Sequence, residues 1–311
     1  MSAGVYFSTN DRVLPWARCF LRSFRKRHPD LPLGLIPFNA ETEVLAQLTD
    51  EFHFQIFEPD PAFERLEAIG DRLEGGHSIG VGRYWYRRYA AFLKDAPFER
   101  FVYLDVRQLV LGSLQPYFDA LAEGLDFVYY DTALNQVYEP GPVRRDFLLQ
   151  GKARGFNSGR WASRKGLFTL EDFERYTDQL VAIRDQMNPR NTDQFFINYA
   201  CDLQGVRYGQ VADFDGGLCQ QGWAGQRGTP YQDNSGDWRL WDYGGLEHRR
   251  KLMLLHWAGY PLESWIPHFG MLTRFGLKMG VGKRLKGIGK GMIRDLKANR
   301  WANERFGRRP S

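Results

Sequence analysis

One strongly apolar segment of this 311-residue chain ends in an acidic residue, and a basic residue follows two positions later. The segment FVYLDVRQLV opens with the apolar run 101–104, continues with Asp105 and then carries Arg107. A carboxylate at the carboxyl end of a buried strand faces the ligand crevice in many open α/β sheets. We therefore expect Asp105 to border a binding site, and the positive charge at Arg107 needs an explanation of its own.

The segments around Asp105 alternate between strand and helix patterns. Strands are expected at residues 5–8, 33–37, 52–57, 101–105 and 126–131, and helices at 16–27, 84–94 and 114–121. This alternation predicts an α/β fold of Rossmann-like type, with a mostly parallel sheet flanked by helices. The strand ends Thr9, Asn10, Asp11, Asp105 and Asp131 would then share one rim of the sheet.

The second half of the chain is less regular. We expect a helix at 171–186, a turn at 188–191 and another helix that starts at Asp193. Residues 215–247 are rich in Gly, Gln, Asp and Trp, and we interpret them as loops over the site. A last apolar run at 252–257 carries His256 near its end.

Four segments, taken in order, resemble the retaining glycosyltransferases of family eight, which include glycogenin and bacterial lipooligosaccharide galactosyltransferases. They are VYFSTND at 5–11, YRRYAAFLKDAPFERFVYLDVR at 86–107, GFNSG at 155–159 with TDQFFIN at 192–198, and LLHWAGY at 254–260. The resemblance implies the GT-A fold and a nucleotide-sugar donor, and it extends over about 260 residues of this sequence.

The resemblance also implies a divalent metal, manganese or magnesium, held by both acids of an Asp-x-Asp motif and by a later histidine. Asp105 and His256 match two of these metal positions, whereas Arg107 stands where the second acid is expected. The family's lysine after His-x-x-Gly has no counterpart in GYPLESW at 259–265. The metal is needed because negative charge grows on the leaving diphosphate as the glycosidic bond breaks.

Three interpretations of Arg107 remain open at this point. The guanidinium itself neutralises the diphosphate, as its fork of donors suits bidentate oxyanion contacts. Alternatively, a metal persists through Asp105, His256 and phosphate oxygens. In the third case the site is inactive, and Arg107 pairs with a neighbouring acid.

The resemblance assigns roles to further residues. Thr9, Asn10 and Asp11 would receive the nucleotide, Arg88 would contact the sugar nucleotide, Asn157, Ser158 and Asp193 would hold the sugar, and Gln194 would lie near the anomeric carbon. Each also has a structural alternative. Arg88 could pair at the surface with Asp95 or Glu99, Asn157 and Ser158 could form a turn, Asp193 could cap a helix, and His256 could be a core histidine.

Charge is distributed unevenly along the chain. Residues 271–311 hold 12 Lys and Arg against two acids, a net charge of +10, whereas residues 1–270 hold 30 basic and 35 acidic residues, a net charge of −5. In the basic tail the apolar residues recur every three or four positions, at Val281, Leu285, Ile288, Met292 and Leu296. We therefore expect a catalytic domain at 1–270 and a tail at 271–311 that binds an anionic membrane surface. An acidic body argues against nucleic acid as a partner.

The three cysteines, Cys19, Cys201 and Cys219, form no metal-ligand spacing, and the N-terminus lacks a signal-peptide pattern. We expect a cytoplasmic protein, peripheral to the inner face of the membrane, that transfers a hexose from a UDP-sugar to a glycan or glycolipid. The alternative is a non-catalytic relative that binds nucleotide sugars or glycans as a partner subunit, or a membrane-tethered scaffold.

Overall fold

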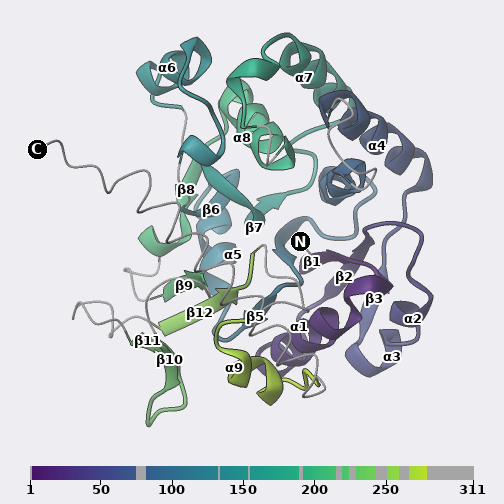
Figure 1. The fold of residues 1–311 in the computed structure, drawn as a ribbon, viewed down its shortest axis with the longest axis vertical. Coiled ribbons are helices and arrows are strands. Elements are labelled where there is room, and N and C mark those ends of the chain that lie inside the picture. The colour runs from purple at the N-terminus through teal and green to yellow at the C-terminus, as the bar shows by residue number, and fades with distance from the viewer. Residues whose placement is uncertain are drawn as a thin grey trace, which may run out of the picture.

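The computed structural model describes residues 2–74, 82–131, 134–152, 155–188, 192–214, 219–223, 229–241, 251–258 and 266–278. These residues form a seven-stranded sheet, a smaller five-stranded sheet and the helices that pack around them (Figure 1).

The larger sheet has the five strands that the sequence predicts and two that it does not, at residues 156–164 and 208–210. They are β1 (Ala3–Thr9), β2 (Leu33–Pro37), β3 (Phe54–Ile56), β4 (Arg100–Asp105), β6 (Phe127–Asp131), β7 (Phe156–Arg164) and β8 (Tyr208–Gln210), in the order β3-β2-β1-β4-β7-β6-β8. Neighbouring strands are parallel except at β7, which runs antiparallel to both β4 and β6. The expected α/β class with a mostly parallel sheet is confirmed.

Both faces of this sheet are buried because side chains alternate between the two sides of each strand. In β1, Val5 and Phe7 enter one hydrophobic cluster and Tyr6 enters the other. The first cluster is covered by η1 (Asp11–Val13), α1 (Leu14–Arg27), α2 (Glu43–Ala46), α3 (Thr49–Phe52), α5 (Gln115–Ala122), η5 (Val211–Asp213) and α9 (Phe269–Arg274). The second is covered by α4 (Asp60–Glu74), η2 (Gly82–Phe92), η3 (Leu134–Gln136), α6 (Pro142–Leu149), α7 (Leu170–Ala182) and α8 (Thr192–Gln204). The short helix η4 (Arg184–Gln186) follows α7 and buries no residue.

The helix expected at 84–94 is a 3₁₀ helix, η2, which begins at Gly82 and ends at Phe92. Side chains three residues apart eclipse one another in a 3₁₀ helix. Tyr86, Tyr89 and Phe92 follow this spacing and form one buried aromatic ridge. Arg88 lies three residues after Trp85, and its guanidinium carbon is 4.9 Å from the centre of that indole ring.

The interpretation of 215–247 as loops is wrong for part of this segment. Residues 219–223 form β9, 229–232 form β10 and 238–241 form β11, which belong to the smaller sheet with β5 (Gln108–Val110) and β12 (Lys251–His256). β10 and β11 are an antiparallel hairpin whose turn includes Gly236 at φ +84°. The hairpin buries Trp238 and Leu240. A strand of only four residues, Trp238–Trp241, is too short for the composition to reveal it. Residues 215–218, 224–228 and 242–247 lie outside the described residues.

The chain remains packed on the core beyond residue 270. Met271 and Leu272 of α9, and Phe275 and Leu277 after it, are buried in the first hydrophobic cluster. The basic segment 279–311, with its expected amphipathic stripe, lies outside the described residues. Among the helices that are described, none has the length and apolar composition needed to span a membrane.

Gly70 provides a test of how closely α4 packs on η2. A Cβ at this position would lie 2.5 Å from the Arg83 Cα. Gly70→Ala would gain about 1 kcal/mol in helix propensity, but overpacking against backbone costs about 1–3 kcal/mol or more. We expect a net loss of stability in urea unfolding. Gly270→Ala, where a Cβ meets no atom within 4 Å, is the matched control and should be neutral or stabilising. A Gly70→Ala protein as stable as wild type would contradict the close approach.

Candidate active site

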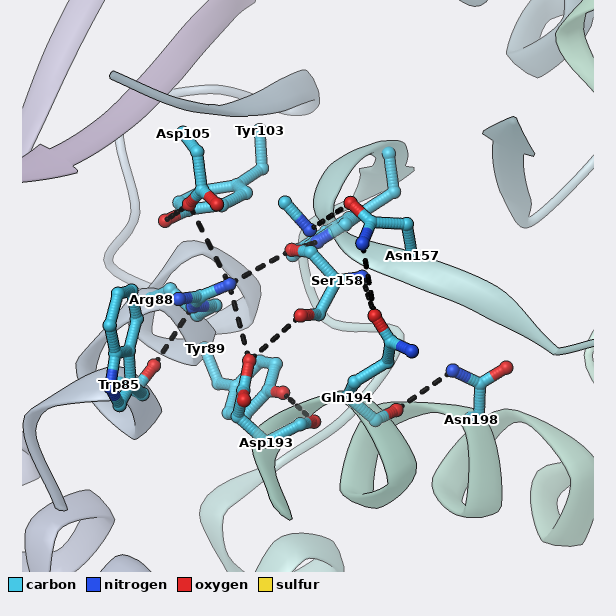
Figure 2. Close-up of polar contacts among 12 residues, drawn as sticks. Trp85, Arg88, Tyr89, Tyr103, Asp105, Asn157, Ser158, Asp193, Gln194 and Asn198 are labelled. Carbon is cyan, nitrogen blue, oxygen red and sulfur yellow. Dashed lines mark hydrogen bonds and ion pairs between the residues drawn. The ribbon is translucent and has the colours of Figure 1, made fainter. Parts of the chain in front are cut away.

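The predicted functional residues gather at one edge of the larger sheet. β1 and β4 are parallel and end at this edge with Thr9 and Asp105. β7 is antiparallel to β4, so its first residues, Asn157 and Ser158, lie at the same edge. The first turn of α8 adds Asp193 and Gln194, whose side chains bond to those of β7 (Figure 2).

A cavity of about 270 Å³ opens at this edge. Its lining includes Thr9, Asn10, Phe38, Trp85, Asp105 and Arg107. This volume is near the lower end of the roughly 300–1,000 Å³ that is usual for small-molecule sites. Arg107 is partly exposed and, among the described residues, its side chain makes no hydrogen bond or ion pair. Within the part of the chain that the structure describes, the Arg107 charge is therefore available to a ligand in this cavity.

Asp11 does not share this arrangement. Its two carboxylate oxygens accept hydrogen bonds from the backbone N–H groups of Val44 and Leu45, each at 3.0 Å. These donors belong to α2, where a carboxylate satisfies otherwise unpaired N–H groups. Asp11 was expected to receive the nucleotide, but it holds α2 in place, and we leave it out of the candidate site.

Arg88 is the centre of the polar network, and it is buried with 2% of its side chain exposed. Its Nη1 lies 3.8 Å from Asp105 Oδ1 and 3.4 Å from Asp193 Oδ2, and it donates to the Ser158 carbonyl at 2.9 Å (Figure 2). The alternative of a surface pair with Asp95 or Glu99 is therefore wrong. Arg87, one residue earlier, points elsewhere and pairs with Glu67.

Burial and neighbouring charges have opposite effects on the pKa values of Arg88 and Asp105. Burial disfavours the charge on Arg88, but Tyr103, Asp105 and Asp193 outweigh it, so the Arg88 pKa is raised. Burial also raises the pKa of Asp105, against the lowering effect of Arg88 and Arg107. Asp105 further accepts a hydrogen bond from the Tyr103 hydroxyl at 3.1 Å. The two carboxylates stay close to each other because Arg88 lies between them.

The second half of the network fixes the start of β7 against α8. Ser158 Oγ donates to Asp193 Oδ2 at 2.8 Å. Gln194 Oε1 accepts from Asn157 Nδ2 at 3.0 Å and from the Ser158 N–H at 3.3 Å. Asn198, one turn further along α8, bonds the Phe156 backbone in both directions. These side chains are thus mutually held.

Gln194 is 4% exposed, and both ends of its amide are bonded. Its oxygen accepts two hydrogen bonds, and its Nε2 donates to the Gln136 carbonyl at 3.4 Å. A carbonyl oxygen has two lone pairs. In this arrangement Gln194 is suited to positioning its neighbours and has no lone pair left for attack on a sugar carbon.

His256 lies at the end of β12, paired in register with Gln108 of β5. Its Nε2 is 4.0 Å from Asp105 Oδ2. Burial, with the positive charges of Arg160 and Arg107, lowers the His256 pKa well below 6.5. The imidazole is therefore neutral at physiological pH, and the two residues proposed as metal ligands do lie together.

Sequence reasoning missed Gly159 and Arg160, which follow the Phe-Asn-Ser motif in β7. A Cβ at Gly159 would lie 2.5 Å from Asp105 Oδ2, so a glycine is required for this approach. Arg160 is fully buried, with its guanidinium carbon 5.0 Å from the centre of the Tyr130 ring. Burial lowers its pKa to about 10, which leaves it charged at neutral pH. Arg160 directly follows the GFNSG motif in the sequence, and a basic residue at that position was the one signal that could have indicated it as a site residue.

The residues present do not fit a divalent metal well. Across the described ranges, no group of three or more His, Cys, Asp or Glu side chains is arranged to hold a metal ion. Asp105 and His256 supply two ligands. The described charges near them are those of two carboxylates, Asp105 and Asp193, and three guanidinium groups, on Arg88, Arg107 and Arg160. A divalent cation would enter a region whose net charge is already positive.

This chain is similar to known proteins in structure but not in sequence. No protein-family model matches the sequence, and a search of curated proteins found no match. Solved glycosyltransferases are nevertheless similar in structure. The galactosyltransferase LgtC, in complex with donor and acceptor sugar analogues, is 13% identical with a TM-score of 0.54, over 91% of this chain and 99% of LgtC. An active-site mutant of LgtC gives a TM-score of 0.57 at 13% identity and the same coverage.

The bifunctional glycosyltransferase WbbM, in its apo form, is 12% identical with a TM-score of 0.53. The match covers 88% of this chain and 49% of WbbM, so this chain spans about half of that protein's length. At these identities the similarity establishes the fold. The chain has the GT-A glycosyltransferase fold, as the sequence motifs predicted.

Burial of His256 predicts how stability depends on pH. Below about pH 6.5 the unfolded imidazole binds a proton that the folded one does not, so stability falls as pH falls, by up to about 1.4 kcal/mol per pH unit. His256→Gln removes this contribution. Between pH 6.5 and about 5, the variant should lose less stability than wild type in urea unfolding. His28 and His268, whose pKa values are also lowered, are present in both proteins and cancel. Parallel stability curves would show that His256 is not held neutral.

Proposed function

We propose that this chain is a glycosyltransferase that moves a hexose from a nucleotide sugar, a UDP-sugar by resemblance, to a glycan or glycolipid acceptor, with retention of anomeric configuration. The observation that carries the proposal is the Arg88 bridge. It joins Asp105, which lines the cavity, to Asp193, which belongs to the Asn157–Ser158–Gln194 network. A site with these two halves suits a ligand with a nucleotide end and a sugar end.

On the nucleotide side, the polar residues Thr9 and Asn10 and the aromatic side chains of Phe38 and Trp85 surround the cavity. The two rings contact each other edge to face, with centroids 4.9 Å apart. Such a lining suits a base and a ribose, because aromatic faces pack on rings and amides bond their edges. LgtC binds donor and acceptor sugar analogues, which supports a sugar donor for this fold.

Arg107 has the clearest chemical role in this proposal. Negative charge develops on the leaving diphosphate, and a positive group already in place lowers the barrier without reorganisation. Arg107 supplies that charge in the cavity, and its planar fork suits two phosphate oxygens. The described residues favour a site in which the Arg107 guanidinium supplies the positive charge that a metal would otherwise supply.

Arg88 was expected to contact the sugar nucleotide, but we assign it a different role. With 2% of its side chain exposed and its donors directed at Asp105, Asp193 and Ser158, it is a positioning residue. Asp193 Oδ2 is held by Ser158 and Arg88, and the carboxylate remains partly exposed. We assign Asp193 to the sugar hydroxyl groups and Gln194 to positioning the start of β7 beneath the sugar.

Donor binding without metal is the first test. By isothermal titration calorimetry, wild-type protein should bind UDP equally well in EDTA and in manganese. Arg107→Ala should weaken binding about 10- to 100-fold, because a hydrogen bond to a charged group contributes about 1.5–3 kcal/mol. Arg18→Ala, an arginine of α1 with a 3.9 Å contact to Glu51, is the control and should bind as wild type does. Loss of UDP binding in EDTA would contradict the proposal that the site binds UDP without a metal ion.

Turnover is the second test, and it also separates the enzyme from a non-catalytic nucleotide-sugar-binding relative. The enzyme should slowly release UDP from a UDP-hexose in the absence of acceptor, whereas the binding protein should retain the donor intact. Asp193→Asn removes a charge from the sugar side and should reduce kcat by about 100-fold or more, with UDP affinity nearly unchanged. A variant that turns over at the wild-type rate would remove Asp193 from the mechanism.

A further inference from the structure

The segment after β6 begins at the candidate active site and leads outward to α6. At its start, the Gln136 carbonyl accepts a hydrogen bond from Gln194 Nε2. At α6 itself, the Val143 N–H donates to Gln186 Oε1 at 3.0 Å. Figure 1 shows α6 at the upper left, projecting beyond α8 and the sheet. Whatever binds α6 is therefore brought to the side of the site that carries Gln194.

α6 exposes a pair of adjacent leucines. Leu148 is 49% exposed and Leu149 is 80% exposed, the two highest values among the large hydrophobic side chains that the structure describes. The same helix turns Phe147 inward, where its ring packs on Tyr138 and Tyr199. The helix is thus anchored by one aromatic side chain and holds its two leucines in solvent.

The charges around the two leucines are mainly positive. Between residues 142 and 152 the basic residues are Arg144, Arg145 and Lys152, and the acid is Asp146. Arg145 lies 3.5 Å from Asp146 and is partly neutralised by it. Arg144 and Lys152 are partly exposed and, among the described residues, have no acidic partner. Exposed leucines flanked by cations are typical of elements that enter an anionic lipid interface.

We propose that α6 is a membrane-contact element, which inserts Leu148 and Leu149 into an anionic lipid surface beside the active site. The area argues against a protein partner as the occupant, since a stable interface buries about 800 Å² on each side and two leucines cannot supply it. A lipid surface needs no such area, and each nearby cation adds to the attraction. This contact is separate from the basic tail expected at 279–311. Its use, to hold a lipid-anchored acceptor near Gln194, rests on the proposed function.

Insertion can be read directly at α6. Leu149→Cys is labelled with an environment-sensitive fluorophore in the full chain, in a Cys219→Ser background, since Cys19 and Cys201 are buried. Vesicles of phosphatidylcholine with about one third phosphatidylglycerol should shift the emission to the blue, and salt should reverse the shift. A label at Val181→Cys, an exposed position on α7, is the control and should not shift. An unshifted label at 149 would overturn the proposal.

Two further measurements distinguish a lipid surface from a second copy of the chain, and the membrane contact from the donor site. A blue shift without vesicles that grows with protein concentration would identify an interface between copies of the chain and overturn the lipid contact. The double variant Leu148→Gln, Leu149→Gln should bind these vesicles at least threefold more weakly, while Val181→Gln binds as wild type does. UDP binding by the double variant should equal that of wild type. If wild type fails to bind UDP yet α6 inserts, the donor site is wrong and the membrane contact stands.

Discussion

The candidate active site depends on one buried guanidinium. Arg88 holds the carboxylate at the end of β4 and the carboxylate in the first turn of α8, at 3.8 and 3.4 Å. Removing one partner from a buried ion pair costs about 3–5 kcal/mol, because the remaining charge is left uncompensated. Arg88 is itself held by the Trp85 carbonyl and by the rings of Trp85 and Tyr103. Trp85 of η2 and Tyr103 of β4 therefore set the position of the charge that assembles the site.

The balance of charge around Asp105 distinguishes this chain from the metal-dependent arrangement that its motifs resemble. Arg107 stands in place of an acid, and Arg160 adds a buried positive charge on the neighbouring strand β7. Both lower the tendency of His256 to take a proton. A diphosphate entering the cavity would meet fixed positive charge that needs no metal, whereas a cation would be repelled by the same groups.

Strand direction explains why distant segments meet at this edge. A single antiparallel strand, β7, brings its first residues, Asn157, Ser158 and Gly159, into contact with the end of β4, where a glycine leaves room for Asp105. The smaller sheet brings His256 to Asp105 through the pairing of β12 with β5. The same edge extends outward through α6, which is exposed to solvent and carries apolar side chains. The candidate site and the exposed leucines of α6 thus belong to different layers of one fold.

By itself, the sequence determined five strands of the larger sheet and the helices α1, α5, α7 and α8, because these buried elements follow apolar runs and periodicities that are local. It did not predict β7, β8 or the long helix α4. It also determined which strand ends carry polar residues, and the order of four motifs indicated the GT-A fold. Only the tertiary structure decided the burial and the partners of each polar side chain. Asp11 caps α2, Arg88 is buried between two carboxylates, and Arg160 is buried close enough to His256 to lower its pKa. The hairpin β10–β11 was also missed. These outcomes depend on contacts between residues far apart in the chain, and local patterns carry no record of such contacts.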